Sequence, residues 1–300
     1  MYIVDYRQIL KEKYNRQKQI SDLQIHNEGN CVHIGQVSPG CYGCVAHTGC
    51  DRSVFIGKKC LFHCPMCYYP SFNGQEDVGN TINDLKTFYF QKKQDPNYHP
   101  TNITFNSEGE PLLYLDSFLQ ISPIISEIEK ERGIKIHKRI YTTGVLLDQE
   151  KIDKIKQLDV EEIRFHLSAS NFDPKLYGII QLAKQNGFRI TVEEPAWPLH
   201  RDKLFQCLPI LDEIGIDHLN IDEIDITPDN IQTINSFYPN GRMYKNLNYH
   251  LYDEGLVYDI MEEVIWHNYR YSVLDCNSDL CRHRIFRSPN IWRASDHLQL

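Results

Sequence analysis

The chain has 300 residues, of which 41% are hydrophobic and 24% are charged, a balance that excludes disordered, collagen-like and coiled-coil proteins. Its 32 basic residues are outnumbered by 40 acidic ones, and the formal charge of −8 argues against nucleic acid as a partner. No apolar run reaches the roughly 18 residues that span a bilayer, and the N-terminus becomes charged too early for a secretory signal. We therefore expect a cytoplasmic protein with no membrane partner.

Short β-rich runs alternate with amphipathic stretches from residue 53 onward. Asp148 and Asp173 are placed to begin two of the helices, and Pro209 predicts a kink or break in a third. Alternation of this kind predicts parallel strands joined by right-handed crossovers, in an open sheet or a partial barrel with its chemistry at the carboxyl ends of the strands. The expected strands cover Ser53–Gly57, Asn102–Asn106, Ile136–Thr142, Glu162–Leu167, Arg189–Glu193 and His218–Ile221.

The chain contains no internal repeat and no low-complexity linker, so we expect one α/β domain with extensions at both ends. Residues 1–52 should form an N-terminal helix and a Cys-rich, loop-like extension. Residues 53–240 should form the βα series. Residues 241–300 should form a C-terminal extension, in which the periodicity predicts one helix around Leu256–Trp266.

Cysteine is the most informative residue type in this chain. Ten cysteines in a long cytosolic protein are poor candidates for disulfides, because reducing compartments keep thiols free, so metal binding is the first alternative. Cys207 falls on an apolar helical stripe and is expected to pack in the core. Seven of the others crowd into one stretch: Cys31, Cys41, Cys44, Cys50, Cys60, Cys64 and Cys67.

Three of these cysteines share one loop directly after the first expected strand. Cys60, Cys64 and Cys67 form a C-x3-C-x2-C pattern, and three thiolates at this spacing can hold three corners of a 4Fe-4S cluster. One iron then has no protein ligand, which leaves a position where a substrate or cofactor can coordinate.

On these residues the sequence resembles the radical S-adenosylmethionine (radical SAM) superfamily, whose signature is this pattern after the first strand of a partial (β/α)6 TIM-type barrel. The resemblance covers roughly residues 53–225. One departure is Met66, because the family usually has an aromatic residue before the last cysteine, whereas here Tyr68 follows it.

Further residues stand where the resemblance implies contacts with S-adenosylmethionine. The Gly109-Glu110-Pro111 segment resembles the family's Gly-Gly-Glu motif, whose backbone binds the amino group of the methionyl part. Ser168 and Ser170 fall where the family contacts the ribose or the carboxylate. The remaining residues that the resemblance implies for cofactor binding are Glu193 and Tyr68.

The resemblance implies a radical enzyme with a 4Fe-4S cluster and S-adenosylmethionine as cofactors, and it leaves open whether the enzyme is an oxidoreductase, a transferase or an isomerase. Reductive cleavage of the sulfonium would give a 5′-deoxyadenosyl radical, which abstracts hydrogen from a small-molecule or peptide substrate. An electron donor such as flavodoxin or ferredoxin is then a partner. Similarity to relatives of pyruvate formate-lyase activating enzyme, carried by Ser38-Pro-Gly-Cys41-x2-Cys44 and Gly215-Ile-Asp-His-Leu-Asn220, adds glycyl-radical activation as a possible role.

The remaining cysteines suggest a second metal centre. Chain ends often meet in a domain, so Cys41, Cys44, Cys276 and Cys281 could form a four-thiolate site, either a second 4Fe-4S cluster or a structural zinc. Cys31 and Cys50 are competing ligands.

A zinc ribbon is the contrasting interpretation. Cys41-x2-Cys44 and Cys64-x2-Cys67 are separated by 19 residues, an ordinary spacing for a structural zinc in a binding protein. This interpretation leaves Cys60 unexplained. It also gives no reason for the two pairs to flank a strand that opens an α/β series.

Overall fold

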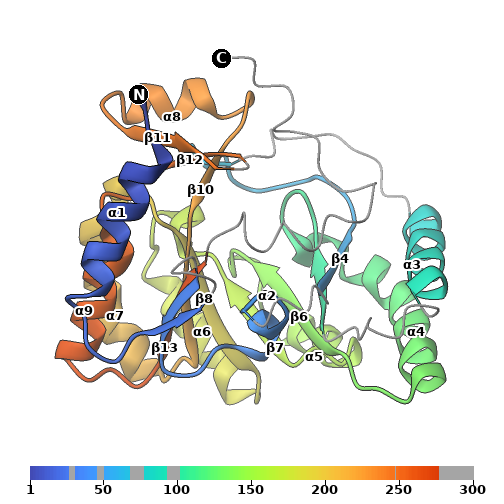
Figure 1. The fold of residues 1–300 in the computed structure, drawn as a ribbon. Coiled ribbons are helices and arrows are strands. Elements are labelled where there is room, and N and C mark those ends of the chain that lie inside the picture. Colours follow the sequence, from blue (N-terminus) through green and yellow to red (C-terminus); the bar gives the residue numbers. More distant parts are fainter. Residues whose placement is uncertain (27–30, 46–50, 68–77, 93–101, 247, 277–300) are drawn as a thin grey trace. The chain divides into compact units, whose positions relative to one another are not determined.

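The computed structural model describes residues 1–26, 31–45, 51–67, 78–92, 102–246 and 248–276 (Figure 1). The chain divides into two compact units. Unit 1 is Met1–Val37, Cys64–Pro70 and Val192–Leu300, and unit 2 is Ser38–His63 and Ser71–Thr191. Within the described ranges, no helix is both long and apolar enough to cross a membrane.

Unit 2 is a run of parallel strands connected by helices. Its strand order is β4-β5-β6-β7, and every neighbouring pair is parallel. The elements in chain order are η2 (Pro39–Cys41), α2 (Tyr42–Val45), β4 (Asp51–Phe55), α3 (Val78–Lys92), β5 (Asn102–Asn106), η3 (Pro111–Tyr114), α4 (Leu115–Arg132), β6 (His137–Thr142), α5 (Gln149–Gln157), β7 (Glu162–Phe165), η4 (Leu167–Ser170), α6 (Lys175–Gln185) and the start of β8 (Arg189–Pro195).

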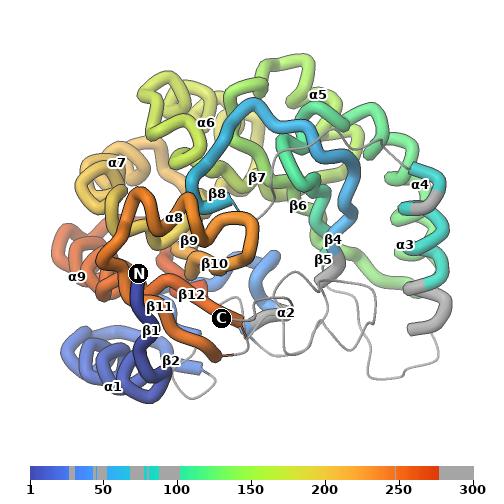
Figure 2. The backbone as a smooth tube through the Cα atoms, turned by 90° about the horizontal axis from the view of Figure 1, so that it is seen from above, coloured from blue at the N-terminus to red at the C-terminus, as the bar shows by residue number. Residues whose placement is uncertain are grey.

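The strands of unit 2 are buried on both faces, and they carry apolar residues as well as buried charged ones such as Arg139 and Glu162. Ile103, Phe105, Ile140 and Phe165 have no exposed surface. Figure 2 shows α4, α5 and α6 outside strands β5, β6 and β7. The start of β8 lies beside β7, where the backbone N–H of Arg189 donates to the carbonyl of Glu161 at 2.9 Å.

Unit 1 contains two sheets. One has the order β2-β3-β13-β9-β8, and the other has the order β1-β11-β12-β10. The elements are β1 (Tyr2–Val4), α1 (Tyr6–Gln17), β2 (Gln24–His26), β3 (Cys31–Ile34), the end of β8, η5 (Pro198–His200), α7 (Arg201–Ile214), β9 (His218–Asp222), β10 (Ile224–Ile226), α8 (Ile231–Phe237), β11 (Arg242–Lys245), β12 (Tyr249–Leu251), α9 (Leu256–Trp266) and β13 (Ser272–Cys276).

The predicted α/β class and the six-strand βα series are confirmed, since β4 to β9 match the expected strands and helices follow β4 to β8. The predicted caps are present: a carboxylate oxygen of Asp148 accepts the N–H of Lys151 at 2.9 Å, and one of Asp173 accepts that of Lys175 at 3.0 Å. The helix at Leu256–Trp266 is also confirmed as α9.

Two expectations were wrong. The region before residue 53 is not simply a helix and loops, because it also contributes strands β1, β2 and β3, and the region after 240 contributes β11, β12 and β13. These strands have five residues or fewer, and β1, β3 and β13 pair with strands far away in the chain, so they give little periodic signal. Of the kink or break expected at Pro209, the break does not occur, because α7 runs through this residue from Arg201 to Ile214.

Candidate functional site

The cysteine loop follows β4 and has no regular secondary structure from Ile56 to Cys67. Cys60 belongs to unit 2, whereas Cys64 and Cys67 belong to unit 1. The thiol-bearing side chains of Cys60 and Cys67 are exposed, and that of Cys64 is half-buried. The N–H of Cys67 donates to the carbonyl of Cys64 at 3.0 Å, so the last two cysteines lie on one tight turn.

The start of this loop lies against the Gly109-Glu110-Pro111 turn. The N–H of Glu110 donates to the carbonyl of Lys59 at 2.8 Å, and the N–H of Lys59 donates to the hydroxyl of Tyr114 at 2.7 Å. A Cβ atom at Gly109 would lie 2.0 Å from the carbonyl oxygen of Lys59. Only glycine permits this approach, so the residue before Cys60 and the predicted cofactor-binding turn are held together by backbone contacts.

The carboxylate of Glu110 is fully buried and fully hydrogen-bonded. One oxygen accepts the hydroxyl of Thr142 at 2.7 Å and the N–H of Leu112 at 3.1 Å. The other accepts the N–H of Thr143 at 2.9 Å and its hydroxyl at 2.6 Å. The side chain therefore connects the ends of β5 and β6. Because each carboxylate oxygen already accepts two hydrogen bonds, a ligand amino group at this turn would donate to backbone carbonyl oxygens, which are hydrogen-bond acceptors.

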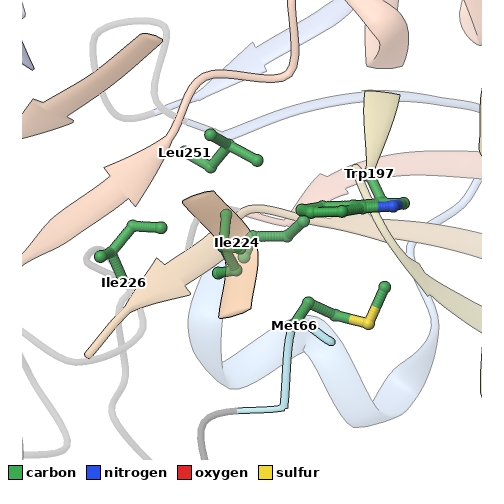
Figure 3. Close-up of a cluster of buried hydrophobic side chains, with 6 residues drawn as sticks. Met66, Trp197, Ile224, Ile226 and Leu251 are labelled. Atoms are coloured by element: carbon green, nitrogen blue, oxygen red, sulfur yellow. The ribbon is translucent and has the colours of Figure 1, made fainter. Parts of the chain in front are cut away.

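The end of the cysteine loop is held by Met66, which stands between Cys64 and Cys67. Met66 is 6% exposed, and Figure 3 shows its side chain beside Trp197 and Ile224. The carbonyl of Met66 accepts a hydrogen bond from the side-chain amide of Asn230 at 3.3 Å. The full cluster of buried residues is Met66, Trp197, Ile224, Ile226, Ile234 and Leu251.

Sequence reasoning did not find Asn230. Its amide nitrogen also donates to the carbonyl of Asp225 at 2.9 Å, and its oxygen accepts the N–H of Thr227 at 2.9 Å. One buried amide thus fixes the turn after β10 and the carbonyl of Met66 together. The Thr-Pro-Asp-Asn run at 227–230 is a recognisable turn signal, but nothing in it points to a loop more than 150 residues away.

We expect Met66→Ala to lower the free energy of unfolding by about 2–4 kcal/mol, because it removes a buried side chain and leaves a cavity. Chemical denaturation of the purified protein measures this change. Leu61→Ala is the matched control, since Leu61 is 46% exposed on the same loop and should cost much less. Equal effects of the two substitutions would contradict the placement of Met66 in the core.

The structure places the other predicted cofactor residues as follows. The hydroxyl of Ser168 lies 3.1 Å from Nε2 of His166, just after β7. Ser170 serves its own turn, because its hydroxyl donates to the carbonyl of Leu167 at 3.0 Å and accepts the N–H of Asp173 at 3.3 Å. Tyr68 lies outside the described residues.

Glu193 and Glu194 lie on opposite faces of β8. The pKa of the Cys207 thiol on α7 is raised mainly by burial and then by the charge of Glu194. Glu194 therefore lies on the face of β8 that is turned toward α7. Because side chains alternate along a strand, Glu193 lies on the other face. There its carboxylate accepts a hydrogen bond from the amide of Asn220 at 3.0 Å.

The Ser-Pro-Gly-Cys segment of unit 2 is held by two buried arginines. Arg139 donates to the carbonyl of Gly40, and Arg164 donates to the sulfur of Cys41 at 3.2 Å. A Cβ atom at Gly40 would lie 2.4 Å from a guanidinium nitrogen of Arg139 and 2.7 Å from one of Arg164. A side chain at this position would have to displace the guanidinium groups, and the buried thiol of Cys41 lies beside the positive charge of Arg164.

The ligand sets predicted for a second centre remain predictions. Cys41 lies in unit 2, and Cys276 lies at the end of β13 in unit 1. Cys281 and the side chain of Cys44 lie outside the described part of the chain. In that part, no three His, Cys, Asp or Glu side chains are already gathered where they could hold a metal ion.

The donor set of the cysteine loop fits an iron–sulfur cluster, for which thiolate sulfur is the ordinary ligand. Three thiols lie within eight residues, two of them exposed, in a segment whose two ends are held by Lys59 and Met66. The loop after β4 therefore supplies the right type and number of sulfur ligands.

Comparisons with known proteins agree with this description. No protein-family model matches the chain. A protein of Methanocaldococcus jannaschii, described as a candidate glycyl-radical enzyme activating enzyme, is 22% identical over 218 residues, which are 70% of this chain and 56% of that protein. This chain therefore corresponds to little more than half the length of that relative.

Among solved structures, Streptococcus suis SuiB bound to the precursor peptide SuiA has a TM-score of 0.54 and 12% identity, over 89% of this chain and 60% of SuiB. SuiB bound to S-adenosylmethionine has a TM-score of 0.53 and 10% identity, over 90% and 60%. At these identities the structures show a shared fold. The resemblance to radical SAM proteins predicted from the cysteine loop is confirmed.

Proposed function

We propose that this chain, whose sequence and fold resemble those of radical SAM enzymes, cleaves S-adenosylmethionine reductively and uses the resulting 5′-deoxyadenosyl radical to remove hydrogen from a substrate. The observation that carries the proposal is the C-x3-C-x2-C loop at the carboxyl end of β4, the first strand of the parallel series. Cys60, Cys64 and Cys67 would hold a 4Fe-4S cluster. When bound, the cluster supplies the electron that breaks the C5′–S bond.

The chain's own residues would bind and orient the cofactor. The turn at Gly109–Pro111 would offer carbonyl oxygens to the amino group, and the hydroxyl of Ser168 would contact the ribose or the carboxylate. Glu193 is oriented by Asn220 on the strand face away from α7, where strand ends of this fold class bind ligands. A cytoplasmic flavodoxin or ferredoxin would deliver the electron.

The substrate would be a peptide or a small molecule. SuiB, which shares the fold, was solved with a precursor peptide bound, and this supports a peptide. The Methanocaldococcus jannaschii protein supports a glycyl-radical enzyme as the target, which is also a polypeptide. Hydrogen abstraction from a polypeptide chain is therefore the version of this function that we favour.

Reconstituted protein reduced with dithionite under anaerobic conditions should convert S-adenosylmethionine to 5′-deoxyadenosine, and Cys60→Ala should reduce the product at least about 100-fold because one cluster ligand is lost. Product is measured by liquid chromatography. Cys60 is exposed, so its substitution should not disturb folding. Cys64→Ala should have the same effect on the product.

Cys207→Ala is the matched control, because Cys207 is a buried core residue on α7 and should be dispensable for product formation. A wild-type protein that makes no 5′-deoxyadenosine, or a Cys60→Ala variant that makes the normal amount, would refute the proposal. The absorbance spectrum separates the zinc-ribbon alternative, since thiolate-bound iron is brown and zinc is colourless.

A further inference from the structure

One peptide unit of the cysteine loop is hydrogen-bonded at both of its ends. This unit joins Met66 to Cys67, so it contains the carbonyl of Met66 and the N–H of Cys67. The N–H donates to the carbonyl of Cys64 at 3.0 Å. The carbonyl accepts a hydrogen bond at 3.3 Å from the side-chain amide of Asn230, which is 164 positions away in the sequence. Rotation of this peptide unit would therefore break both hydrogen bonds. All four residues belong to unit 1.

The sequence of the loop favours this turn. Residues 64–67 read Cys-Pro-Met-Cys, and a proline at the second position of a four-residue turn is favourable because its φ angle already suits the turn. The side chain of Met66 is buried beside Trp197 and Ile224 (Figure 3), and Cys64 packs against the same hydrophobic cluster. Asn230 adds a contact of a different kind, because it fixes the direction in which a peptide unit points.

The amide of Asn230 matches its three partners. Its nitrogen carries two N–H groups, which donate to the carbonyls of Met66 and Asp225, and its oxygen accepts the N–H of Thr227. The opposite assignment of oxygen and nitrogen would set acceptor against acceptor and donor against donor. Asn230 is 2% exposed, so water cannot readily take the place of its amide.

We propose that Asn230 is a positioning residue that keeps the reduction potential of the cluster low. The inference rests on the proposed function, in which Cys64 and Cys67 bind a 4Fe-4S cluster. A backbone N–H that donates to a cluster or ligand sulfur stabilises the reduced form, which carries one more negative charge, and so raises the potential. Because Asn230 holds the carbonyl of Met66, the N–H of Cys67 stays on the carbonyl of Cys64 and is withheld from sulfur. A lower potential makes the cluster a stronger one-electron donor to the sulfonium.

Asn230→Ala should raise the reduction potential, because the released peptide unit can turn its N–H toward sulfur. The ratio of reduced to oxidised cluster at a fixed solution potential should rise at least about threefold, which is a shift of about 28 mV for a one-electron couple. Reconstituted protein is poised at a series of solution potentials under anaerobic conditions, and the reduced cluster is quantified by electron paramagnetic resonance.

Ile152→Ala is the matched control for lost stability. Ile152 is fully buried on α5 in unit 2, so its truncation should destabilise the protein and leave the potential at the wild-type value. Asn230→Ser keeps the test possible if Asn230→Ala fails to fold. The serine hydroxyl can still accept the N–H of Thr227, but the side chain is one atom shorter and loses Met66, so the potential should rise as in Asn230→Ala.

The outcomes separate this inference from the proposed function. A potential in the Asn230 variants that equals the wild-type value or lies below it would overturn the inference, and so would an equal rise in Ile152→Ala. A wild-type protein that assembles no 4Fe-4S cluster would overturn the proposed function and this inference with it. A wild-type protein that assembles the cluster but makes no 5′-deoxyadenosine would overturn the proposed function alone.

Discussion

Glu162→Gln should lower the free energy of unfolding by about 3–5 kcal/mol, the usual cost of removing one partner from a buried ion pair. The Glu162 carboxylate is fully buried at the start of β7. One oxygen accepts hydrogen bonds from Nε of Arg164 and the hydroxyl of Thr191, each at 2.7 Å. The other lies 2.7 Å from both the hydroxyl of Ser38 and Nε2 of His137. The substitution leaves the buried Arg164 without its counter-charge.

The same carboxylate should make stability depend on pH in acid. Burial alone would raise the pKa of Glu162, but Arg164, the hydrogen bond from His137 and the charge of Arg139 hold it well below its usual 4.5. A depressed folded-state pKa gives stability that is fully present above about pH 4.5 and is lost as the pH falls toward the folded-state value. Denaturation curves measured between pH 7 and pH 3 should therefore show that the free energy of unfolding falls more steeply with pH for wild type than for Glu162→Gln.

Glu161→Gln is the matched control for this prediction. Glu161 is adjacent in sequence and also contacts His137, at 2.9 Å, but its side chain is 41% exposed. Exposed pairs contribute about 0–1 kcal/mol, so this variant should stay close to wild type at every pH. The account of Glu162 fails if the two variants lose the same stability.

Glu110→Gln should weaken the binding of S-adenosylmethionine at least about tenfold, because the turn that includes Gly109 is positioned by this carboxylate. A glutamine has one acceptor oxygen, and its NH2 group would face either the two donors of Thr143 or those of Thr142 and Leu112. Buried donors without acceptors each cost about 1–3 kcal/mol, so the turn should also lose stability.

Calorimetric titration of reconstituted protein with S-adenosylmethionine measures the affinity, and Glu150→Gln serves as the control because its side chain is 77% exposed on α5. The Glu110→Asp variant should also bind S-adenosylmethionine weakly, because the shorter side chain keeps the charge but cannot reach the hydrogen-bond donors that Glu110 contacts. Normal affinity in Glu110→Gln would show that the turn does not position the cofactor. Unchanged stability in the same variant would show that the hydrogen bonds of Glu110 are not needed.

The strands of the βα series could be predicted from sequence because local signals specify them. Ile103 and Phe105 alternate with polar residues in a short β-rich segment, and Asp148 begins a helix whose buried positions are evenly spaced. The short strands β1 and β13 lack such signals, because their pairing depends on residues far away in the chain. Pro209 also could not be interpreted from the local sequence alone. It weakens isolated helices, but α7 stays continuous across it in the folded protein.

The candidate site divides in a similar way. The spacing of Cys60, Cys64 and Cys67 is visible in the sequence because the three ligands are local. The position of Asn230 under the loop is not visible, because the contact joins residues brought together only by folding.

The pairing of β3 with β13 also constrains the order of events during biosynthesis. Val32 leaves the ribosome more than 240 residues before its partner Asp275, and the β1 residue Ile3 similarly precedes Met243. At 5–20 residues per second this delay is on the order of ten seconds or more. Strands β1 and β3 must wait that long for these partners, so each has a backbone edge that other chains could pair with while translation continues.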